Sequence, residues 1–542
     1  MPARRSSSPC WPPGSGSDLT HPTYVDDRGI HAPGPAEVAD NEPIDILFGG
    51  NRVWSFTTGH DGRAEGSGML VAWPAPLKER LDGVAQVTVV PHNGGDTLFV
   101  GSVRFGSSDK ELELVDDVGH PLSLDKGGRL QRTFDRMDEA ARLELVEAAR
   151  RVLDDLTQKC GLDAYLAYGG LLGAVRDGKM IGHDSDADVA WISRHTHPFD
   201  IVREARAAER TLRGLGWSVV RMSAANFKVW VPLPTGKRAG VDVFGSFHIG
   251  DHFHITGSLR GVLPREAVLP FGTVTLEGVE FPAPADVEAF LAYTYGPSWR
   301  MPDPAFHFEH PPENTRMMSQ WWRGTRTRLA HWQTFYTSGD VKRVPSGPSL
   351  FASWVAGRIE PGSRVVELGS GTGRDAYWLA DQGFAVIGSD YCGAARKLAR
   401  AGSARRRKQG KRSVQFKGIN MESQYNVLTN GARLAHEPGP KHVYARLLVD
   451  ALARPARPGL WRFCSMAGRS GGHTFLEFRT AANRGRPTFF GPHARTYADP
   501  DEIAAEIASY GGRVIDRVGG TDLAPLGKEN PVICRMEVSW TR

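Results

Sequence analysis

A pair of glycines, Gly169 and Gly170, precedes Asp184, Asp186 and Asp188 in the segment YGGLLGAVRDGKMIGHDSDADVAW. The apolar residues around the aspartates predict a β-strand, from which alternate carboxylates project on one face. Carboxylates that close repel one another unless a cation lies among them, and Mg²⁺ prefers such oxygens and keeps substrate phosphates as further ligands. Glycines ahead of a helix let backbone amides approach a phosphate. The segment therefore predicts a site for a metal-bound phosphate, with loop-capping aspartates as the alternative.

A further carboxylate lies in the segment AGVDVFGSFHI, where Asp242 stands in an apolar run that reads as a second strand. We expect Asp242 to be the third carboxylate of a two-metal site, and a solvent-facing strand end is the alternative. Arg176, at the end of the short helix expected after the glycines, is a candidate catalytic residue because its charge can balance a phosphate. Lys179 offers the same charge, but it could equally be a solvated helix end.

The elements around this site are predicted from hydrophobic periodicity. Apolar residues recur at helical spacing within residues 134–160 and predict a long amphipathic helix. Residues 43–130 have period two with turn clusters and predict a small β-rich domain of unknown role. Residues 1–42 are rich in Ser, Pro and Gly, and we expect them to form a disordered tail.

The stretch GGLLGAVRDGKMIGHDSDADVAW resembles the signature of the LicD-type phosphotransferases, which have the nucleotidyltransferase fold. The later stretch LEGVEFPAPADVEAFLAYTYGPSW is similar to the closing element of that family. The resemblance implies a nucleotidyltransferase-fold α+β domain at residues 134–310. It also implies that a metal ion is held by Asp186, Asp188 and Asp242, and that the phosphate is cradled by Gly169 and Gly170.

The sequence departs from the family pattern at two positions. His183 stands where the family usually has tryptophan, and Ser185 interrupts the acidic run. The sequence retains the pair Asp186 and Asp188, so the expectation of metal binding stands. The departures put in doubt the contacts to the acceptor.

A second site is indicated after a linker at residues 311–330, in the segment SRVVELGSGTGRDAYWLADQGFAVIGSD. The pattern predicts a strand, a glycine-rich turn, a helix and a second strand that ends at Asp390, 17 residues past Gly373. This is the plan of a nucleotide-binding βαβ unit, with the acidic residue placed for ribose hydroxyls.

The G-x-G-x-G spacing, with Glu367 two residues ahead of it, resembles the first motif of class I S-adenosylmethionine-dependent methyltransferases. A dinucleotide-binding Rossmann domain is the alternative. The resemblance implies a Rossmann-like methyltransferase domain at residues 331–542. It places the cofactor against Glu367, Gly369, Ser370, Gly371, Gly373, Asp390, Asn420 and Met421.

The composition sets further bounds. The chain has 542 residues, enough for several domains, and a formal net charge of +5 that suits phosphate-bearing ligands without requiring nucleic acid. Its five cysteines are scattered without a C-x-x-C pair, and we find no apolar run of membrane-spanning length, so we expect a cytoplasmic protein without disulfides or structural zinc. The basic run at residues 395–412 is expected to be a solvated loop, with RNA contact as the alternative.

Together these observations predict a multidomain α/β protein that is a bifunctional transferase. One half is expected to use Mg²⁺ to move a phosphoryl-linked group from a nucleotide-activated donor to a glycan or related hydroxyl acceptor, such as a cell-surface polysaccharide. The other half is expected to methylate the same or a related substrate with S-adenosylmethionine. The alternatives are an RNA-modifying enzyme and a regulatory protein with one inactive half.

Overall fold

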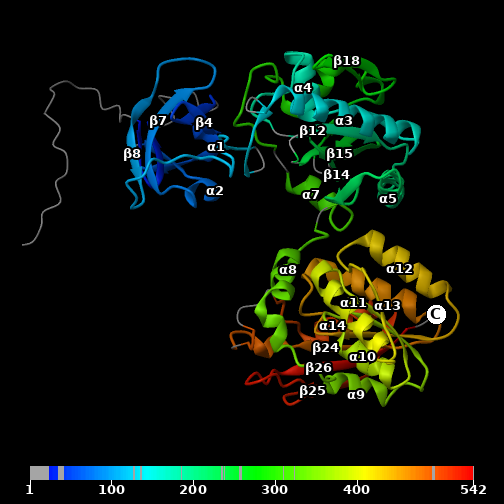
Figure 1. Ribbon diagram of the computed structural model, residues 1–542. Helices are drawn as coiled ribbons and strands as arrows, with labels where there is room; N and C mark the ends of the chain where they lie inside the picture. Colours follow the sequence, from blue (N-terminus) through cyan, green and yellow to red (C-terminus); the bar gives the residue numbers. More distant parts are fainter. Residues whose placement is uncertain are drawn as a thin grey trace, which may run out of the picture. The chain divides into compact units, whose positions relative to one another are not determined.

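The computed structural model describes residues 23–33, 42–66, 68–125, 128–134, 137–184, 186–233, 236, 238–255, 259–308, 311–322, 324–486, 488–490 and 495–540. The chain divides into two compact units (Figure 1). The first comprises Met1–Arg194, Ala207–Arg221 and Asn226–His310, and the second comprises His195–Arg206, Met222–Ala225 and Pro311–Arg542.

The first unit begins with two antiparallel sheets that share one apolar core. The sheet β1-β2-β6-β5 consists of Tyr24–Val25, Gly29–Ala32, Gly68–Ala72 and Gly62–Glu65. The sheet β4-β3-β7-β8 consists of Asn51–Phe56, Ile44–Phe48, Gly83–Pro91 and Phe99–Phe105. Short elements complete this part: β9 (Ser123–Leu124), β10 (Leu130–Gln131), α1 (Thr58–Asp61) and α2 (Ala75–Lys78).

The β-rich part starts earlier in the chain than the sequence predicted. Residues 23–33, which fall within the expected disordered tail, contain β1 and β2, and β2 pairs with β6. Ile30 is fully buried in the shared core. The prediction was wrong for this stretch because the Ser, Pro and Gly content of residues 1–42 hid a short segment with apolar side chains to bury. The rest of the expected tail, residues 1–22 and 34–41, lies outside the described residues, as does Ser185.

The remainder of the first unit is built on one mixed sheet of order β11-β12-β15-β14-β13, which β16 and β17 extend from β15. Its strands are β11 (Asp163–Leu166), β12 (Ala187–Ile192), β13 (Ser218–Arg221), β14 (Phe227–Pro232), β15 (Arg238–Ile249), β16 (His252–Ile255) and β17 (Leu259–Val262). A hairpin of β18 (Gly272–Leu276) and β19 (Val279–Ala283) follows. The helices are α3 (Glu139–Gln158), α4 (Tyr168–Arg176) and α6 (Val287–Tyr295), together with the second half of α5 (Pro198–Gly214), whose first half is assigned to the second unit.

Helix α3 packs on this sheet through the apolar stripe that the sequence predicted. The predicted stripe residues are all buried: Leu145, Ala148, Ala149, Val152, Leu153 and Leu156. They lie on one face because the helix repeats every 3.6 residues. The amphipathic helix expected before the acidic segment is therefore confirmed.

The second unit contains one sheet of order β22-β21-β20-β23-β24-β26-β25, in which all neighbours from β22 to β24 are parallel. Its strands are β20 (Arg364–Leu368), β21 (Ala385–Ser389), β22 (Gln415–Lys417), β23 (Lys441–Arg446), β24 (Thr474–Arg479), β25 (Gly512–Gly520) and β26 (Ile533–Trp540). Its helices are α7 (Pro312–Met317), α8 (Leu329–Thr337), α9 (Leu350–Ala356), α10 (Arg374–Asp381), α11 (Gly393–Lys408), α12 (Gln424–His436), α13 (Arg457–Gly468) and α14 (Pro500–Ala508).

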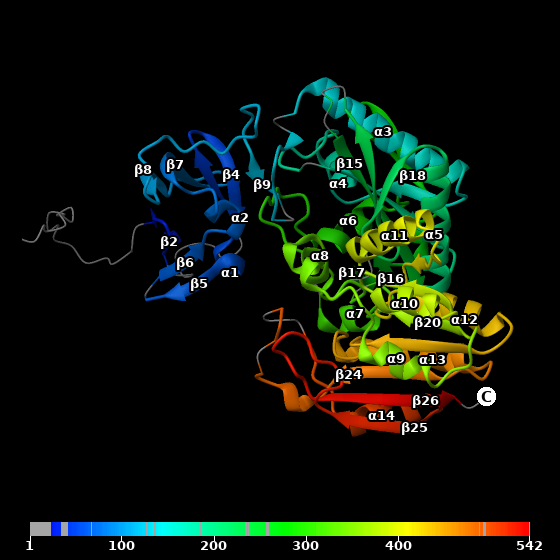
Figure 2. The same ribbon diagram turned by 60° about the horizontal axis from the view of Figure 1, so that its bottom comes forward.

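Helices cover both faces of this sheet (Figure 2). Successive residues of a strand point to opposite faces, so Val365 packs with α9 and α10 while Val366 packs with α12, α13 and α14. Tyr444 and Phe475 repeat the first arrangement on the neighbouring strands. Strand order reverses between β20 and β23, which is where ligands bind in open α/β sheets.

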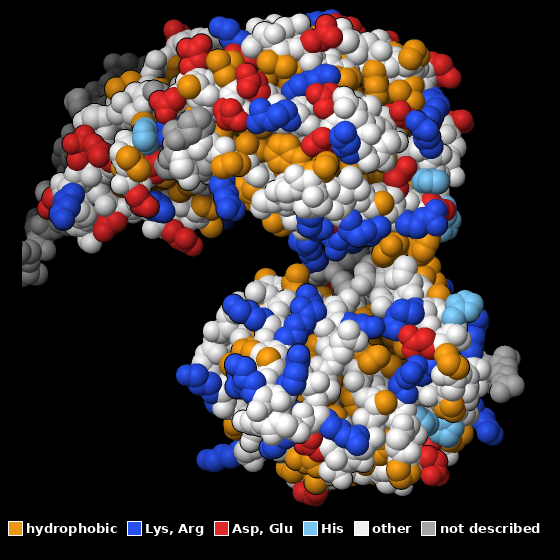
Figure 3. Space-filling model, turned by 45° about the vertical axis from the view of Figure 1, so that its right-hand side comes forward, with side chains coloured by type: hydrophobic (Ala, Val, Ile, Leu, Met, Phe, Trp, Pro, Cys, Tyr) orange, Lys and Arg blue, Asp and Glu red, His pale blue; other side chains and the backbone are white. Residues whose placement is uncertain are grey.

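The basic run at residues 395–412 is helical over most of its length, so the expected loop is wrong. Small residues at helical spacing form the buried face of α11: Ala394, Ala395, Ala399 and Ser403. Arg400 donates to the backbone oxygen of Phe416 at 2.9 Å, which joins the helix to β22. In Figure 3, Lys and Arg side chains are spread over the visible face of the second unit. Among the described residues, no helix is long and apolar enough to cross a membrane.

Candidate functional sites

The acidic cluster of the first unit lies where β12 begins. Asp184, Asp186 and Asp188 each offer an oxygen, and these atoms all lie within 4.8 Å of one another. Strand β12 begins at Ala187, so Asp188 is the member of the cluster within the strand, and the expectation that one extended strand carries all three is wrong. The chain turns at residues 182–183 before the strand, and it still brings the three carboxylates together. Such a cluster is suited to a hard divalent cation.

The two glycines lie within the first turn of α4 rather than in a turn ahead of it. A Cβ on Gly169 would come within 2.5 Å of Asp184 Oδ2, and one on Gly170 would come within 2.9 Å of Leu166 Cδ1. The Gly169 amide donates to Asp188 Oδ2 at 3.2 Å. Gly169 therefore makes room for the carboxylates and Gly170 for the Leu166 side chain, and the predicted role of both as a phosphate cradle stays a prediction.

Three adjacent strands place a further carboxylate and a lysine beside the cluster. Asp188 on β12 pairs in register with Asp242 on β15, and Asp242 pairs with Lys228 on β14. The Lys228 Nζ lies 3.2 Å from an oxygen of Asp186 and 3.2 Å from an oxygen of Asp242. The structure thus brings Asp186, Asp188 and Asp242 into one neighbourhood, with a cation that the sequence analysis missed. The sequence feature that could have indicated Lys228 is the presence of a lysine inside the apolar stretch FKVWV.

The charges of this group depend on one another. The pKa of Asp242 is raised to about 7, mainly by burial and then by the nearby Asp186 carboxylate, while Lys228 opposes the shift. Burial alone would lower the pKa of Lys228, but the facing carboxylates of Asp242 and Asp186 outweigh it, and the net shift is upward. Lys228 is therefore a permanent cation near neutral pH.

Arg176 lies beside the acidic cluster at the end of α4. It lines a cavity of about 80 Å³ together with Gly169, His183 and Asp184. Its Nε donates to Asp177 Oδ2 at 2.9 Å. Arg52, from β4 of the β-rich part, lines the same cavity. The sequence analysis gave the β-rich part no chemistry, and no motif around Arg52 pointed to this site.

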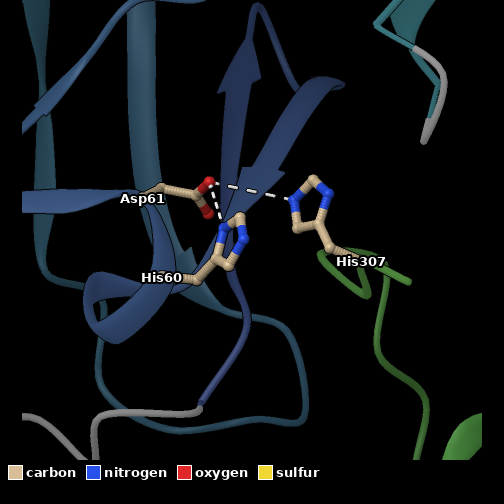
Figure 4. Close-up of side chains that lie close together, drawn as sticks. All are labelled: His60, Asp61 and His307. Carbon is tan, nitrogen blue, oxygen red and sulfur yellow. Dashed lines mark hydrogen bonds and ion pairs between the residues drawn. The ribbon is translucent and has the colours of Figure 1, made fainter. Parts of the chain in front are cut away.

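A second group of possible metal ligands lies elsewhere in the first unit (Figure 4). Asp61 Oδ1 is 2.9 Å from His60 Nδ1 and 3.8 Å from His307 Nε2. The two imidazole rings are stacked, with centroids 4.3 Å apart and planes 14° apart. Asp61 Oδ2 already accepts from the Thr57 amide at 3.0 Å. The group is partly exposed and its members satisfy one another, so it gives no support for a metal of its own.

The glycine-rich turn of the second unit borders a cavity of about 240 Å³. The cavity lies at the carboxyl ends of β20 and β21, at the point where strand order reverses. Most of the residues predicted to bind the cofactor line it: Glu367, Gly369, Ser370, Gly371, Asp390, Asn420 and Met421. Gly373, the remaining one, does not line the cavity and is the N-cap of α10.

The turn requires glycine at these positions. Gly369, Gly371 and Gly373 have φ values of 71°, 53° and 85°, in the left-handed region that residues with a side chain rarely adopt. A Cβ on Gly371 would also lie 2.7 Å from Tyr336 Oη, and one on Gly373 would lie 2.6 Å from Phe416 Cζ. Gly373 therefore acts through packing, whereas Gly371 keeps the cavity wall open.

Asp390 ties the turn to the end of the next strand. Its carboxylate accepts from the amides of Gly371 at 3.0 Å and Cys392 at 2.8 Å. Burial raises the pKa of Asp390, and these backbone bonds oppose the rise. Asn420 donates to the backbone oxygen of Thr325 at 2.5 Å and accepts from the Glu422 amide at 2.9 Å. Both side chains are held in fixed positions at the edge of the cavity.

Several polar atoms at the cavity are buried without a partner among the described residues. They include Glu367 Oε2 and Ser370 Oγ. Burial, followed by the charge of Asp375, raises the pKa of Glu367 well above its usual value. Buried polar groups are normally hydrogen-bonded, so these atoms fit a ligand with hydroxyl or amino groups. S-adenosylmethionine has both kinds of group.

Aromatic side chains form another wall of this cavity, and the sequence analysis missed them. Trp332, Phe335 and Tyr336 come from α8, and Phe335 contacts Phe490 edge-on with centroids 5.1 Å apart. Helix α8 spans the end of the predicted linker and the first residues of the predicted methyltransferase domain, where no motif was recognised because its aromatic residues resemble ordinary core residues.

Glu422 provides a prediction about pH. It lines the cavity, and burial raises its pKa from 4.5 to about 7 against hydrogen bonds from Thr327. Between these pH values the folded protein holds a proton that the unfolded chain has lost, so the wild-type stability falls as pH rises from 4.5 to 7. Glu422→Gln removes this pH-dependent loss of stability, because glutamine does not titrate. We expect the variant to have a higher melting temperature than the wild type at pH 8 and an equal one near pH 4.

The matched control is Glu360→Gln, because Glu360 is exposed on the same unit. Its melting temperature should follow the wild type at every pH. If the melting temperatures of Glu422→Gln and the wild type differ by the same amount at every pH between 4 and 8, the assignment of a raised pKa to Glu422 is contradicted.

Comparison with known proteins assigns part of the chain. Residues 161–286 match the family model described as LicD/FKTN/FKRP, nucleotidyltransferase domain. The matched range includes Asp184, Asp186, Asp188 and Asp242. No curated protein matches the chain in sequence.

Similar solved structures include three methyltransferases. A SAM-dependent methyltransferase from Anabaena variabilis ATCC 29413 has a TM-score of 0.30 and 14% identity, and the match covers 39% of this chain and 95% of that one. Magnesium protoporphyrin IX methyltransferase from Synechocystis PCC 6803 with bound SAH has a TM-score of 0.29 and 14% identity, covering 39% and 99%. The glycopeptide N-methyltransferase MtfA complexed with S-adenosyl-L-methionine has a TM-score of 0.28 and 16% identity, covering 36% and 95%. At these levels of similarity, the chemistry of the second unit must be argued from its own residues.

Proposed function

We propose that this chain, a transferase that contains a LicD-type nucleotidyltransferase domain at residues 161–286, joins two activities. The first is divalent-cation-dependent transfer of a phosphoryl-linked group from a nucleotide-activated donor to a hydroxyl acceptor of the glycan type. The second is methylation of the same or a related substrate with S-adenosylmethionine.

One observation carries the first activity. Asp188 and Asp242 occupy paired positions on the parallel strands β12 and β15, and the preceding turn adds Asp184 and Asp186. These carboxylates would hold a divalent cation, which supplies positive charge to the phosphates of the donor. Arg176, at the neighbouring cavity, would add charge to the phosphate undergoing transfer. In-line displacement at phosphorus needs mainly such positioning and charge stabilisation.

The second activity is supported by the cavity beside the glycine-rich turn. Asp390 is fixed at the end of β21, where an acidic residue meets a ribose diol in nucleotide-binding βαβ units. Glu367 and Ser370 offer buried polar atoms to the cofactor, and Gly369 and Gly371 leave space for it. S-adenosylmethionine supplies an activated methyl group, and the cavity walls would orient it toward the acceptor.

The test of the first activity is product analysis. Purified protein with Mg²⁺ is incubated with CDP-alcohols and, separately, with nucleoside triphosphates, each with a panel of glycan acceptors. Release of CMP together with modified acceptor supports the proposal. Release of pyrophosphate from a triphosphate would instead indicate nucleotidyl transfer, and absence of both products over the panel counts against the transferase reaction proposed here.

The link between the two activities is tested with methyl-labelled S-adenosylmethionine. We expect label to enter the acceptor panel or the product of the first reaction. Labelling of an unrelated substrate alone would contradict a shared substrate, although it would leave both separate activities in place.

A further inference from the structure

Lys228 lies at the position that a second metal ion would need. Its Nζ is 3.2 Å from an oxygen of Asp186 and 3.2 Å from an oxygen of Asp242. The side chain is 7% exposed, so the ammonium is largely shielded from solvent. In two-metal sites the ions lie about 3.5–4 Å apart and are clamped by carboxylates of this kind.

The lysine is held in this position by the strands around it. A Cβ on Gly240 would lie 2.7 Å from Lys228 Cδ, so glycine at this position of β15 leaves a slot for the lysine chain. The Nζ lies 5.5 Å from the centre of the Trp230 ring, within range of a cation–π contact. Lys228 also pairs in register with Asp242, which aligns the ammonium with the carboxylate. The strands of the sheet therefore fix the position of the Lys228 ammonium.

An ammonium and a metal ion exclude each other from this position. Mg²⁺ binds oxygens at about 2.0–2.1 Å in octahedral geometry, and an adjacent fixed positive charge repels it. The other side of Asp186 differs, because Asp184 and Asp188 offer oxygens within 4.8 Å of it. One position in the site therefore suits a divalent ion, and the other is filled by a residue of the chain.

We propose that Lys228 is a built-in cation that replaces the second metal ion, so that this site takes a single divalent ion on Asp184, Asp186 and Asp188. The inference rests on the proposed function of the first unit, because it concerns the same site. It changes the expected role of Asp242, which serves as the anchor of Lys228 instead of completing a two-metal centre.

Binding of Mn²⁺ to the full chain tests this proposal. Free Mn²⁺ is followed by electron paramagnetic resonance during titration, and ions that survive Asp186→Asn in the same background are subtracted, because Asp186 borders both positions of the site. We expect the wild type to bind one ion that is sensitive to Asp186→Asn. Lys228→Met opens the second position, so it should bind two such ions, whereas Lys228→Arg should keep one.

Two further variants separate charge from folding. Gly240→Ala leaves the lysine in the chain but fills its slot, so it should also admit a second ion. Lys179→Met removes an exposed lysine of the same domain and should leave one ion. Melting curves for each variant establish that it is folded. If Lys228→Met is unfolded, the number of ions bound by Gly240→Ala and by Lys228→Arg is compared instead, and this comparison tests the role of Lys228.

The possible failures are distinguishable. Two Asp186-sensitive ions in the wild type, or a single ion of unchanged affinity in folded Lys228→Met and Gly240→Ala, overturn the role of Lys228 but leave the proposed function in place. Loss of all Mn²⁺ binding in folded Lys228→Met also overturns it, since the lysine would then be ordering the ligands. Absence of any Asp186-sensitive ion in the wild type removes the metal site itself, and the proposed function with it.

Discussion

Replacing Asp188 with asparagine is expected to lower the rate of the phosphoryl-group transfer at least about a hundredfold, because losing even an outer-shell partner of a metal typically costs 10- to 100-fold. Asparagine keeps the shape of the side chain, and its oxygen can still accept from the Gly169 amide. It removes a negative charge from the cluster with Asp184 and Asp186. The rate of donor cleavage, read as release of the nucleoside monophosphate, is the measurement.

Two controls make this result specific. Asp251→Asn changes an exposed aspartate between β15 and β16 and should retain the wild-type rate. The melting temperature of Asp188→Asn without metal should not fall, because the substitution relieves repulsion between carboxylates. S-adenosylmethionine affinity should also be unchanged. A full transfer rate in Asp188→Asn would show that the acidic cluster is not the reaction centre.

The sequence was sufficient to predict the parts of the fold that follow a local pattern. The apolar stripe of α3 and the strand–turn–helix plan around Gly369 were visible because each depends on residues close together in the chain. The cavity-lining positions after β20 and β21 followed from the same plan, since parallel strands end at one edge of a sheet.

Features that depend on pairing between distant segments were not visible. Lys228 lies near Asp186 because β14 and β12 both flank β15, and no spacing in the sequence encodes that arrangement. Arg52 reaches the cavity beside Arg176 from a part of the chain with no motif. The helical form of the basic run was in principle readable from the small residues at its buried positions, but its charge obscured them.

The two units use acidic residues differently, and the difference follows from their surroundings. In the first unit the carboxylates of the acidic cluster lie close to one another and to a lysine, so their neighbours are largely other charged side chains. In the second unit Asp390 is already satisfied by two backbone amides, which fixes it as a hydrogen-bond acceptor for a ligand. The proposed metal site and the proposed ribose site thus differ in what holds each carboxylate.

The second large expected effect concerns Asp390 and the binding of S-adenosylmethionine. Asp390→Asn is expected to weaken binding of S-adenosylmethionine about 10- to 100-fold, because a hydrogen bond to a charged group contributes about 1.5–3 kcal/mol and each 1.4 kcal/mol is tenfold in affinity. Its amide group also cannot accept from both the Gly371 and Cys392 amides as the carboxylate does. Isothermal titration calorimetry with S-adenosylmethionine measures the change.

Asp381→Asn is the matched control, because Asp381 lies on α10 in the same unit and pairs with Arg406 at the surface. It should bind the cofactor as the wild type does. Phosphoryl-group transfer should be unaffected by either variant, since Asp390 belongs to the other unit. If Asp390→Asn binds S-adenosylmethionine with wild-type affinity, Asp390 makes no contact with the ribose. If the wild type shows no binding at all, the cavity beside the glycine-rich turn serves a different ligand, and its unpartnered Glu367 and Ser370 atoms indicate that this ligand is polar.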